Sequence, residues 1–292
     1  MEMVNNKMKV ALIPNDFSMD LEKVFQLCNQ HSVQYVELAY MWGKSILDLN
    51  EEELKKVESL LNKYDLKTAS IQTQIMKVFP PDAKLHKEGK ETMHRDFAYN
   101  KNRIDRAIIL AKRFQAKYII GYSFFTYLEK VTKKNWNLLL ETYAEFLPKL
   151  REAGVIMAIE CEGDTYIQDI DSYLRLFHHF DDDPHLQANL DLSNLYSKQN
   201  IFDKGEFNRI RPYLSYLHVK DRKWRKILWN KSAVFGEGSV RWEKVLKWLK
   251  ESKYTGFLSI EPHVHGKNKF EKGRQCVLNL QNLLKKLSIS YE

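Results

Sequence analysis

LQANLDL, residues 186–192, is the stretch that decides the fold. Apolar and polar residues alternate along it, and the polar face consists of Gln187, Asn189 and Asp191. Successive side chains of a β-strand point to opposite faces, so the pattern predicts a strand with one polar face. The last residue of that face is a carboxylate, which is then placed at the end of the strand.

Three further apolar runs have the same design. They are VIMAIE at 155–160, LSYLHVK at 214–220 and GFLSIE at 256–261. Each run ends in polar side chains that share a face with alternate residues of the strand. These side chains are Glu160, His218, Lys220 and Glu261.

The rest of the chain repeats a unit that consists of one strand followed by one helix. Four earlier apolar runs cover 8–14, 34–40, 67–75 and 117–124, and helical spacing follows each of them. Asn50 and Glu53 stand at the spacing of a capping box at one helix start. Eight strand–helix units are typical of a (β/α)₈ TIM barrel, an α/β fold of roughly 250 residues. We therefore predict one such domain over residues 1–292.

An open, doubly wound sheet is the alternative fold for alternating strands and helices. That fold often has a glycine-rich phosphate-binding turn after its first strand. Here the first strand leads into IPNDFSMD, which has no glycine. The sequence favours the barrel.

The barrel predicts where chemistry occurs, because active sites of this fold lie at the carboxyl ends of the strands. Glu160, Asp191, His218 and Glu261 end four consecutive predicted strands. Any one of them alone is more often a loop cap, a salt-bridge partner or a core histidine. Together they predict a site for one divalent metal ion, Mn²⁺, Mg²⁺, Co²⁺ or Zn²⁺, because converging buried carboxylates need a cation.

The amino-acid composition limits the kinds of molecule that the protein is expected to bind. The net charge of +8 would suit an acidic partner, but the lysines are spread over predicted helix faces such as 51–64. Nucleic acid is therefore not the expected partner.

No apolar run is long enough for a membrane span, and the start of the chain lacks the apolar stretch of a secretory signal. Three widely spaced cysteines suggest no disulfide framework, so we expect a cytoplasmic protein. A homo-oligomer is compatible with the sequence.

Several segments resemble a known family. They are AIE at 158–160, NLDLSN at 189–194, LHVKD at 217–221, GEGSVRW at 236–242 and YTGFLSIEP at 254–262. These segments resemble the xylose isomerase-like barrels, a sugar phosphate isomerase/epimerase group that includes inosose dehydratases and ketose 3-epimerases. The resemblance implies a carbohydrate or polyol substrate and a metal held by Glu160, Asp191, His218 and Glu261.

The chain departs from that family at three positions. Asn194 stands where many members have a histidine, Tyr166 where ketose 3-epimerases have a glutamate, and Trp224 where they have an arginine. The resemblance therefore supports the metal more than any particular substrate. The endonuclease IV branch needs extra histidines for three zinc ions, but strands three and four end in Gln72, Gln74 and Tyr122.

The expected reaction is proton transfer next to a carbonyl through a metal-stabilised ene-diolate. Glu160 and Glu261 would act as base and acid. Lys220 would polarise an oxygen or act as a base with a lowered pKa, or else form a salt bridge to the ligand carboxylates. The same scaffold also suits an inosose dehydratase-like or keto-glycoside lyase, or an endonuclease IV-like or non-catalytic sugar-binding barrel.

Candidate substrate-binding residues surround these groups. Glu37 would bind a sugar hydroxyl or form a structural ion pair, and Arg222 would bind a phosphate or face water. His263 would support Glu261 or be exposed. The remaining candidates for the pocket wall are Gln74, Asn194 and Tyr166.

Overall fold

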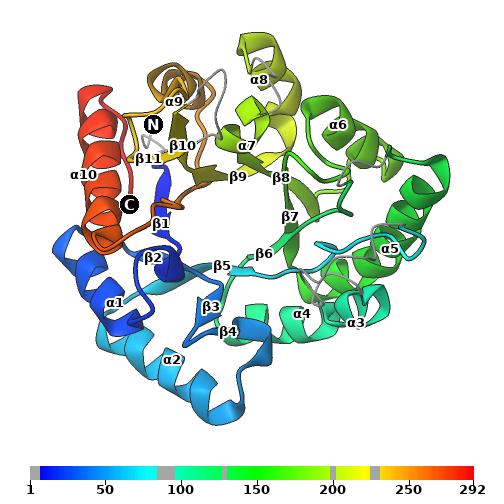
Figure 1. Cartoon of the computed structure of the whole chain (residues 1–292), viewed down its shortest axis with the longest axis horizontal. Helices are drawn as coiled ribbons and strands as arrows, with labels where there is room; N and C mark the ends of the chain where they lie inside the picture. Colours follow the sequence, from blue (N-terminus) through cyan, green and yellow to red (C-terminus); the bar gives the residue numbers. More distant parts are fainter. Residues whose placement is uncertain (1–6, 84–95, 127–129, 198–201, 224–230) are drawn as a thin grey trace, which may run out of the picture.

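A closed barrel of eight parallel strands forms the centre of the protein in the computed structural model (Figure 1). The structure describes residues 7–83, 96–126, 130–197, 202–223 and 231–292. Around the barrel the strand order is β1-β12-β9-β8-β7-β6-β5-β2. The predicted (β/α)₈ barrel is confirmed. The strands are β1 (Lys9–Leu12), β2 (Tyr35–Leu38), β5 (Lys67–Gln72), β6 (Tyr118–Gly121), β7 (Ile156–Glu160), β8 (Leu186–Asp191), β9 (Leu214–Val219) and β12 (Phe257–Ile260).

Helices form a ring outside the strands (Figure 1). The longer helices present an apolar stripe to the barrel, as α9 does with Trp242, Val245, Leu246 and Leu249, all buried. The predicted capping box at the start of α2 is confirmed, because Asn50 and Glu53 exchange two hydrogen bonds of 2.9 Å. The helices are α1 (Leu21–Gln30), α2 (Glu51–Lys63), α3 (Phe97–Asn102), α4 (Ile104–Arg113), α5 (Lys133–Ala153), α6 (Ile170–His179), α7 (Leu192–Ser197), α8 (Lys204–Ile210), α9 (Trp242–Glu251) and α10 (Lys269–Lys286).

Strand alternation divides the core into two parts. Leu186, Ala188 and Leu190 of β8 join the large cluster between the strands and the helices. A smaller cluster fills the barrel itself and includes Ile156 and Ala158, the residues that precede Glu160 on its face. Since alternate residues of a strand share a face, Glu160 is directed to the inside of the barrel.

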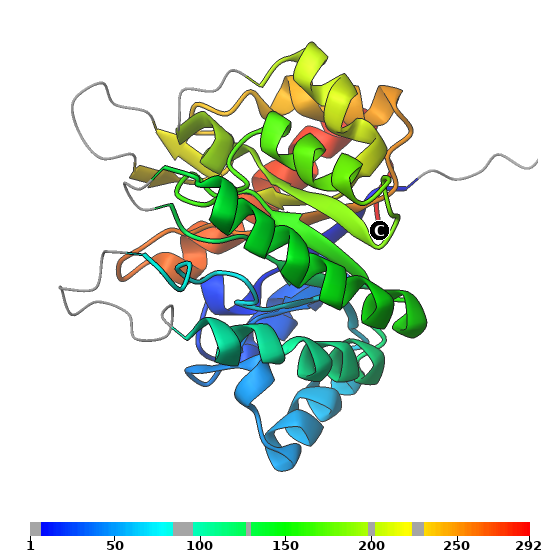
Figure 2. The same ribbon diagram turned by 90° about the vertical axis from the view of Figure 1, so that its right-hand side faces the viewer.

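The side view shows the two ends of the barrel (Figure 2). The C-terminus lies at the amino ends of the strands, where Glu292 N donates to Met8 O at 2.9 Å. The carboxyl ends of the strands, with the predicted ligands, therefore face away from the C-terminus. No helix among the described residues is long and apolar enough to cross a membrane.

The loops differ from the sequence prediction in detail. The predicted strand 67–75 ends at Gln72, and Thr73 turns the chain by donating its hydroxyl to Ile120 O at 2.7 Å. Short elements that the sequence did not predict lie at the carboxyl ends of the strands. They are the hairpins β3 (Tyr40–Met41) with β4 (Lys44–Ser45) and β10 (Asp221–Lys223) with β11 (Lys231–Ala233), and the 3₁₀ turns η1 (Pro14–Asp16) and η2 (Ile46–Asp48). A further 3₁₀ turn, η4 (Arg211–Tyr213), precedes β9.

Candidate metal centre

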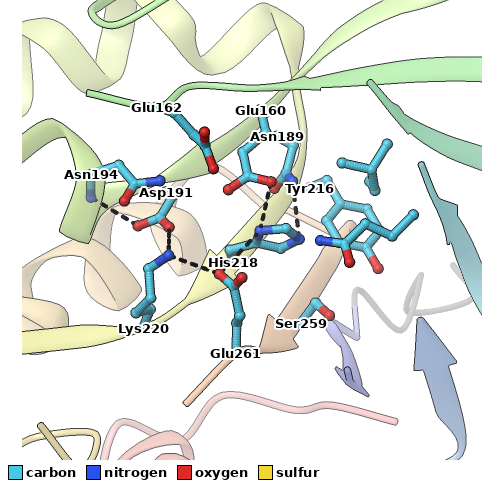
Figure 3. A network of polar contacts seen from close by, with 12 residues as sticks. Glu160, Glu162, Asn189, Asp191, Asn194, Tyr216, His218, Lys220, Ser259 and Glu261 are labelled. Carbon is cyan, nitrogen blue, oxygen red and sulfur yellow. Dashed lines mark hydrogen bonds and ion pairs between the residues drawn. The ribbon is translucent and has the colours of Figure 1, made fainter. Parts of the chain in front are cut away.

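The four predicted ligands converge at the carboxyl end of the barrel (Figure 3). Glu160 ends β7, Asp191 ends β8, His218 lies on β9, and Glu261 directly follows β12. One ligand atom from each lies within 4.8 Å of the corresponding atoms of the others, and all four side chains are buried. We call these four residues the acidic cluster.

The polar atoms of this cluster fit a cation. Glu160 Oε2 and Glu261 Oε2 lie 3.3 and 3.4 Å from the same atom, His218 Nδ1. Within the described part of the chain, neither Glu160 Oε2 nor His218 Nδ1 has a hydrogen-bond partner. Buried polar atoms without partners are costly, and a divalent ion that accepts oxygen and nitrogen ligands would satisfy both.

The other ring nitrogen of His218 lies close to a buried carboxylate and a buried amide. His218 Nε2 lies 3.1 Å from Glu37 Oε1 and 3.1 Å from Asn189 Nδ2. The second oxygen of Glu37 accepts from Tyr216 at 2.6 Å and from Ser259 at 2.9 Å. A carboxylate that accepts from one imidazole nitrogen leaves the other free to bind a metal. Glu37 is therefore placed to orient His218 rather than to meet a sugar hydroxyl.

Lys220 forms the salt bridges that were one of its predicted alternatives. Its Nζ lies 2.6 Å from Asp191 Oδ2 and 3.0 Å from Glu261 Oε2. Burial lowers the pKa of this amine, but the nearby carboxylates, Asp191 first, outweigh burial and raise the pKa above its ordinary value. The lowered pKa that a lysine base requires is not found.

The pKa values of the two predicted acid–base carboxylates are shifted in opposite directions. Burial raises the pKa of Glu160, and attraction to His218 offsets only part of that effect. Burial also acts to raise the pKa of Glu261, but His263, Lys220 and His218 together hold it well below its ordinary value. Such a difference suits one group to hold a proton while the other stays ionised.

Two of the predicted substrate-binding residues, Asn194 and Tyr166, make contacts within the protein. The backbone of Asn194 donates to Asp191 Oδ1 at 3.0 Å, and its side chain donates to Cys161 O at 3.1 Å. Tyr166 is buried, and its ring is stacked on Trp136 with centroids 6.5 Å apart. Both positions differ from the family pattern, and both contribute packing and loop geometry here.

The remaining predicted pocket residues lie in loops. Gln74 is in the turn after β5, where its carbonyl accepts from Asn100 Nδ2 at 2.5 Å. Arg222 lies on β10 and is half-buried. Its positive charge acts to lower the pKa of Lys220. Neither side chain is among the residues that converge on the acidic cluster.

An ion pair at the mouth was missed by the sequence reasoning. Lys77 Nζ lies 2.7 Å from Glu162 Oε1 and 4.5 Å from the centre of the Tyr122 ring. Burial lowers the pKa of Lys77, but Glu162, Glu160 and Glu261 outweigh it, so the pKa is raised. Alternation beyond Glu160 points to Glu162, which Figure 3 shows beside Glu160. No sequence signal places Lys77, because it lies in a connection.

Asp221 links two of the segments on which the family resemblance rests. Its carboxylate accepts from the backbone N–H groups of Arg222, Gly236, Gly238 and Val240 at 2.9 to 3.2 Å. The aspartate of LHVKD thus folds the GEGSVRW segment against the end of β9. The segment ends at Trp242, the first residue of α9, whose Nε1 donates to Lys220 O at 3.3 Å.

A surface hollow of about 540 Å³ lies at the opposite end of the barrel, lined by Lys9, Lys117, Tyr118 and Phe257 among others. The amino ends of barrel strands contribute stability rather than catalysis. The acidic cluster, at the carboxyl ends, remains the candidate centre.

Known proteins share this architecture. The family model described as "Xylose isomerase-like TIM barrel" matches residues 25–280. No curated protein matches the chain.

Solved structures match over nearly the whole chain. The probable 3-DHS dehydratase AsbF from Bacillus anthracis is 18% identical with a TM-score of 0.71, covering 93% of this chain and 99% of that one. The 3-keto-D-glucoside 4-epimerase YcjR from E. coli is 13% identical with a TM-score of 0.72, covering 94% and 100%. A xylose isomerase-like protein from Mycobacterium smegmatis in complex with magnesium is 16% identical with a TM-score of 0.69, covering 97% and 96%. At these identities the likeness shows the fold.

Proposed function

Because the chain belongs to the xylose isomerase-like TIM barrel family, we propose that it is a divalent-metal-dependent sugar or sugar phosphate isomerase or epimerase. The observation that carries the proposal is the convergence of Glu160, Asp191, His218 and Glu261, with buried side-chain atoms that have no hydrogen-bond partner among the described residues. Such a cluster at the carboxyl ends of barrel strands is where this fold performs catalysis.

The metal would be Mn²⁺, Mg²⁺, Co²⁺ or Zn²⁺, bound by these four side chains. Support comes from the donor set, from the orientation of His218 by Glu37, and from the magnesium in the similar Mycobacterium smegmatis protein. When bound, such an ion supplies Lewis-acid stabilisation of the negative charge that develops when a proton leaves the carbon next to a carbonyl.

Side chains of this chain would move the proton and hold the substrate. Glu160, at the end of β7, and Glu261, directly after β12, would act as a base and acid pair on the substrate carbon. Lys220 holds Asp191 and Glu261 in place. The Lys77–Glu162 pair would offer a donor and an acceptor to substrate hydroxyls at the mouth.

A lyase is the second candidate, because abstraction of the same proton also begins the loss of a β-hydroxyl as water. The observation that favours it is the fold shared with the dehydratase AsbF as well as with the epimerase YcjR. This candidate covers inosose dehydratase-like and keto-glycoside lyase activities.

Product analysis in deuterated water distinguishes the two candidates. We would incubate the Mn²⁺- or Co²⁺-loaded protein with ketoses, their phosphates, inososes and keto-glycosides, and follow products by mass spectrometry and NMR. Deuterium incorporation with every hydroxyl retained supports the isomerase or epimerase. Loss of one hydroxyl as water supports the lyase. Absence of turnover across the panel with metal bound would contradict both and favour a non-catalytic sugar-binding or endonuclease IV-like barrel.

A further inference from the structure

Glu261 faces two different groups of side chains. Its Oε2 lies 3.0 Å from Lys220 Nζ and 3.4 Å from His218 Nδ1, within the acidic cluster. Its Oε1 lies 2.8 Å from His263 Nε2, outside the cluster. A carboxylate whose two oxygens point to separate groups has the arrangement needed to bridge two cations.

The second group consists of Asp16, Glu261 and His263. Asp16 ends η1, which follows β1, and His263 follows β12, which pairs with β1. His263 Nε2 lies 3.4 Å from Asp16 Oδ2, and one ligand atom from each of the three residues lies within 4.8 Å of the others. Two carboxylates from separate segments of the chain thus converge on one imidazole nitrogen, as they do at His218.

The backbone of His263 is held in an uncommon conformation. Its φ is 48°, in the left-handed region that residues other than glycine seldom adopt. The side chain is 39% exposed, so solvent or a ligand reaches it. The imidazole is therefore positioned by the loop, with room beside it.

The contact network that contains this second group has more carboxylates than cationic side chains. Direct contacts connect five carboxylates with Lys220, His218 and His263, so the carboxylates outnumber these three side chains even when both imidazoles are protonated. These carboxylates are Asp16, Glu37, Glu160, Asp191 and Glu261.

We propose that Asp16, Glu261 and His263 hold a second divalent cation at the rim between β12 and β1. One imidazole and two carboxylates suit Mn²⁺, Co²⁺ or Zn²⁺, with open positions for water or substrate oxygens. The inference shares Glu261 with the proposed centre but does not depend on the reaction catalysed.

Metal stoichiometry tests the inference. The metal-free full chain is titrated with Mn²⁺, and bound metal is measured by equilibrium dialysis with atomic emission and by EPR. We expect two Mn²⁺ per chain with a spin-coupled EPR signal. His263→Ala and Asp16→Asn should each bind one, with an uncoupled signal. The matched control His265→Ala, which changes an exposed histidine two residues further on, should bind two.

The outcomes separate this inference from the proposed centre. A single Mn²⁺ that is lost in His218→Ala but kept in His263→Ala would overturn the second site and leave the first. No Mn²⁺ at all would overturn both. Two Mn²⁺ retained in both His263→Ala and Asp16→Asn would also overturn it, because the second ion would then lie elsewhere. Circular dichroism identifies any variant that fails to fold, and the other variant then decides.

Discussion

At the scale of single residues, the centre depends on a carboxylate that would touch no metal. Glu37 is fully buried and accepts from His218, Tyr216 and Ser259. We expect Glu37→Gln to weaken Mn²⁺ binding by about 10- to 100-fold, because the amide no longer fixes the tautomer that leaves His218 Nδ1 free. Isothermal titration measures this. Glu145→Gln, an exposed carboxylate paired with Lys101, is the control, and equal affinity in the two variants would contradict the role of Glu37.

Lys77 tests the mouth of the site rather than the metal. Lys77→Met removes a donor that lies 2.7 Å from Glu162 Oε1. We expect KM for the preferred substrate to rise about tenfold, since hydrogen bonds to charged groups contribute about 1.5–3 kcal/mol. Mn²⁺ affinity should not fall, because Lys77 is not a proposed ligand and its removal takes a positive charge away from Glu160 and Glu261.

The control for Lys77 is Lys134→Met, which removes an exposed ion pair with Asp82. Steady-state kinetics on both variants gives the comparison. A loss of kcat at constant KM in Lys77→Met would contradict a binding role for this residue.

The sequence predicted the residues on strands, but it did not predict Lys77 and Asp16, which lie outside strands. Glu160, Asp191 and His218 were predictable because strand alternation fixes both the height and the direction of a side chain. Lys77 and Asp16 follow no such period, because loops and 3₁₀ turns set their direction through tertiary contacts. Glu37 was predictable as a strand residue, but its partners come from β9 and β12, which the local sequence does not specify.

At the scale of elements, the loop that follows β11 is folded around Asp221. A Cβ on Gly238 would lie 1.9 Å from Asp221 Oδ1 and 2.8 Å from Arg222 N. Gly238→Ala should therefore displace the carboxylate and lower the free energy of unfolding by about 1–3 kcal/mol, the usual cost of overpacking. Urea unfolding followed by circular dichroism measures the change.

Gly205→Ala is the matched control, because its Cβ would meet only the Asp203 side chain, at 3.1 Å, at the start of α8. We expect this change to alter the free energy of unfolding by less than about 1 kcal/mol in either direction, because alanine restricts the unfolded chain while its Cβ presses on Asp203 Oδ1, which accepts from Glu206 N at the start of α8. Equal stability of Gly238→Ala and the wild type would show that Asp221 does not organise the loop.

The elements themselves were predictable to different degrees. All eight strands were found, because buried parallel strands read as short apolar runs between helical patterns. The hairpin β3–β4 was not, because each strand is two residues long and has no periodicity to detect. The end of β5 was placed too late, because the apolar pattern continues through Ile75 while the chain already turns at Thr73.

At the scale of the whole molecule, the carboxylates of the acidic cluster favour the protonated form of His218 when no metal is bound. Burial lowers the pKa of His218, but Glu160, Glu37 and Glu261 outweigh burial and raise it well above its ordinary value. A raised folded-state pKa gives stability that is present below the unfolded value and lost as pH rises through the folded value. The metal-free protein should therefore lose this contribution toward alkaline pH.

Metal binding has the opposite pH dependence, because the ligands bind in deprotonated form. We expect a fixed Mn²⁺ concentration, about 100 times the Kd at pH 8, to stabilise the fold at that pH by about 2.7 kcal/mol and to raise Tm by about 5 °C. The rise should grow from pH 6 to pH 8 in differential scanning calorimetry against the EDTA-treated protein. His179→Ala, an exposed histidine on α6, should behave like the wild type, whereas His218→Ala should lose most of the rise. A rise that is equal in both variants would place the stabilising cation outside the acidic cluster.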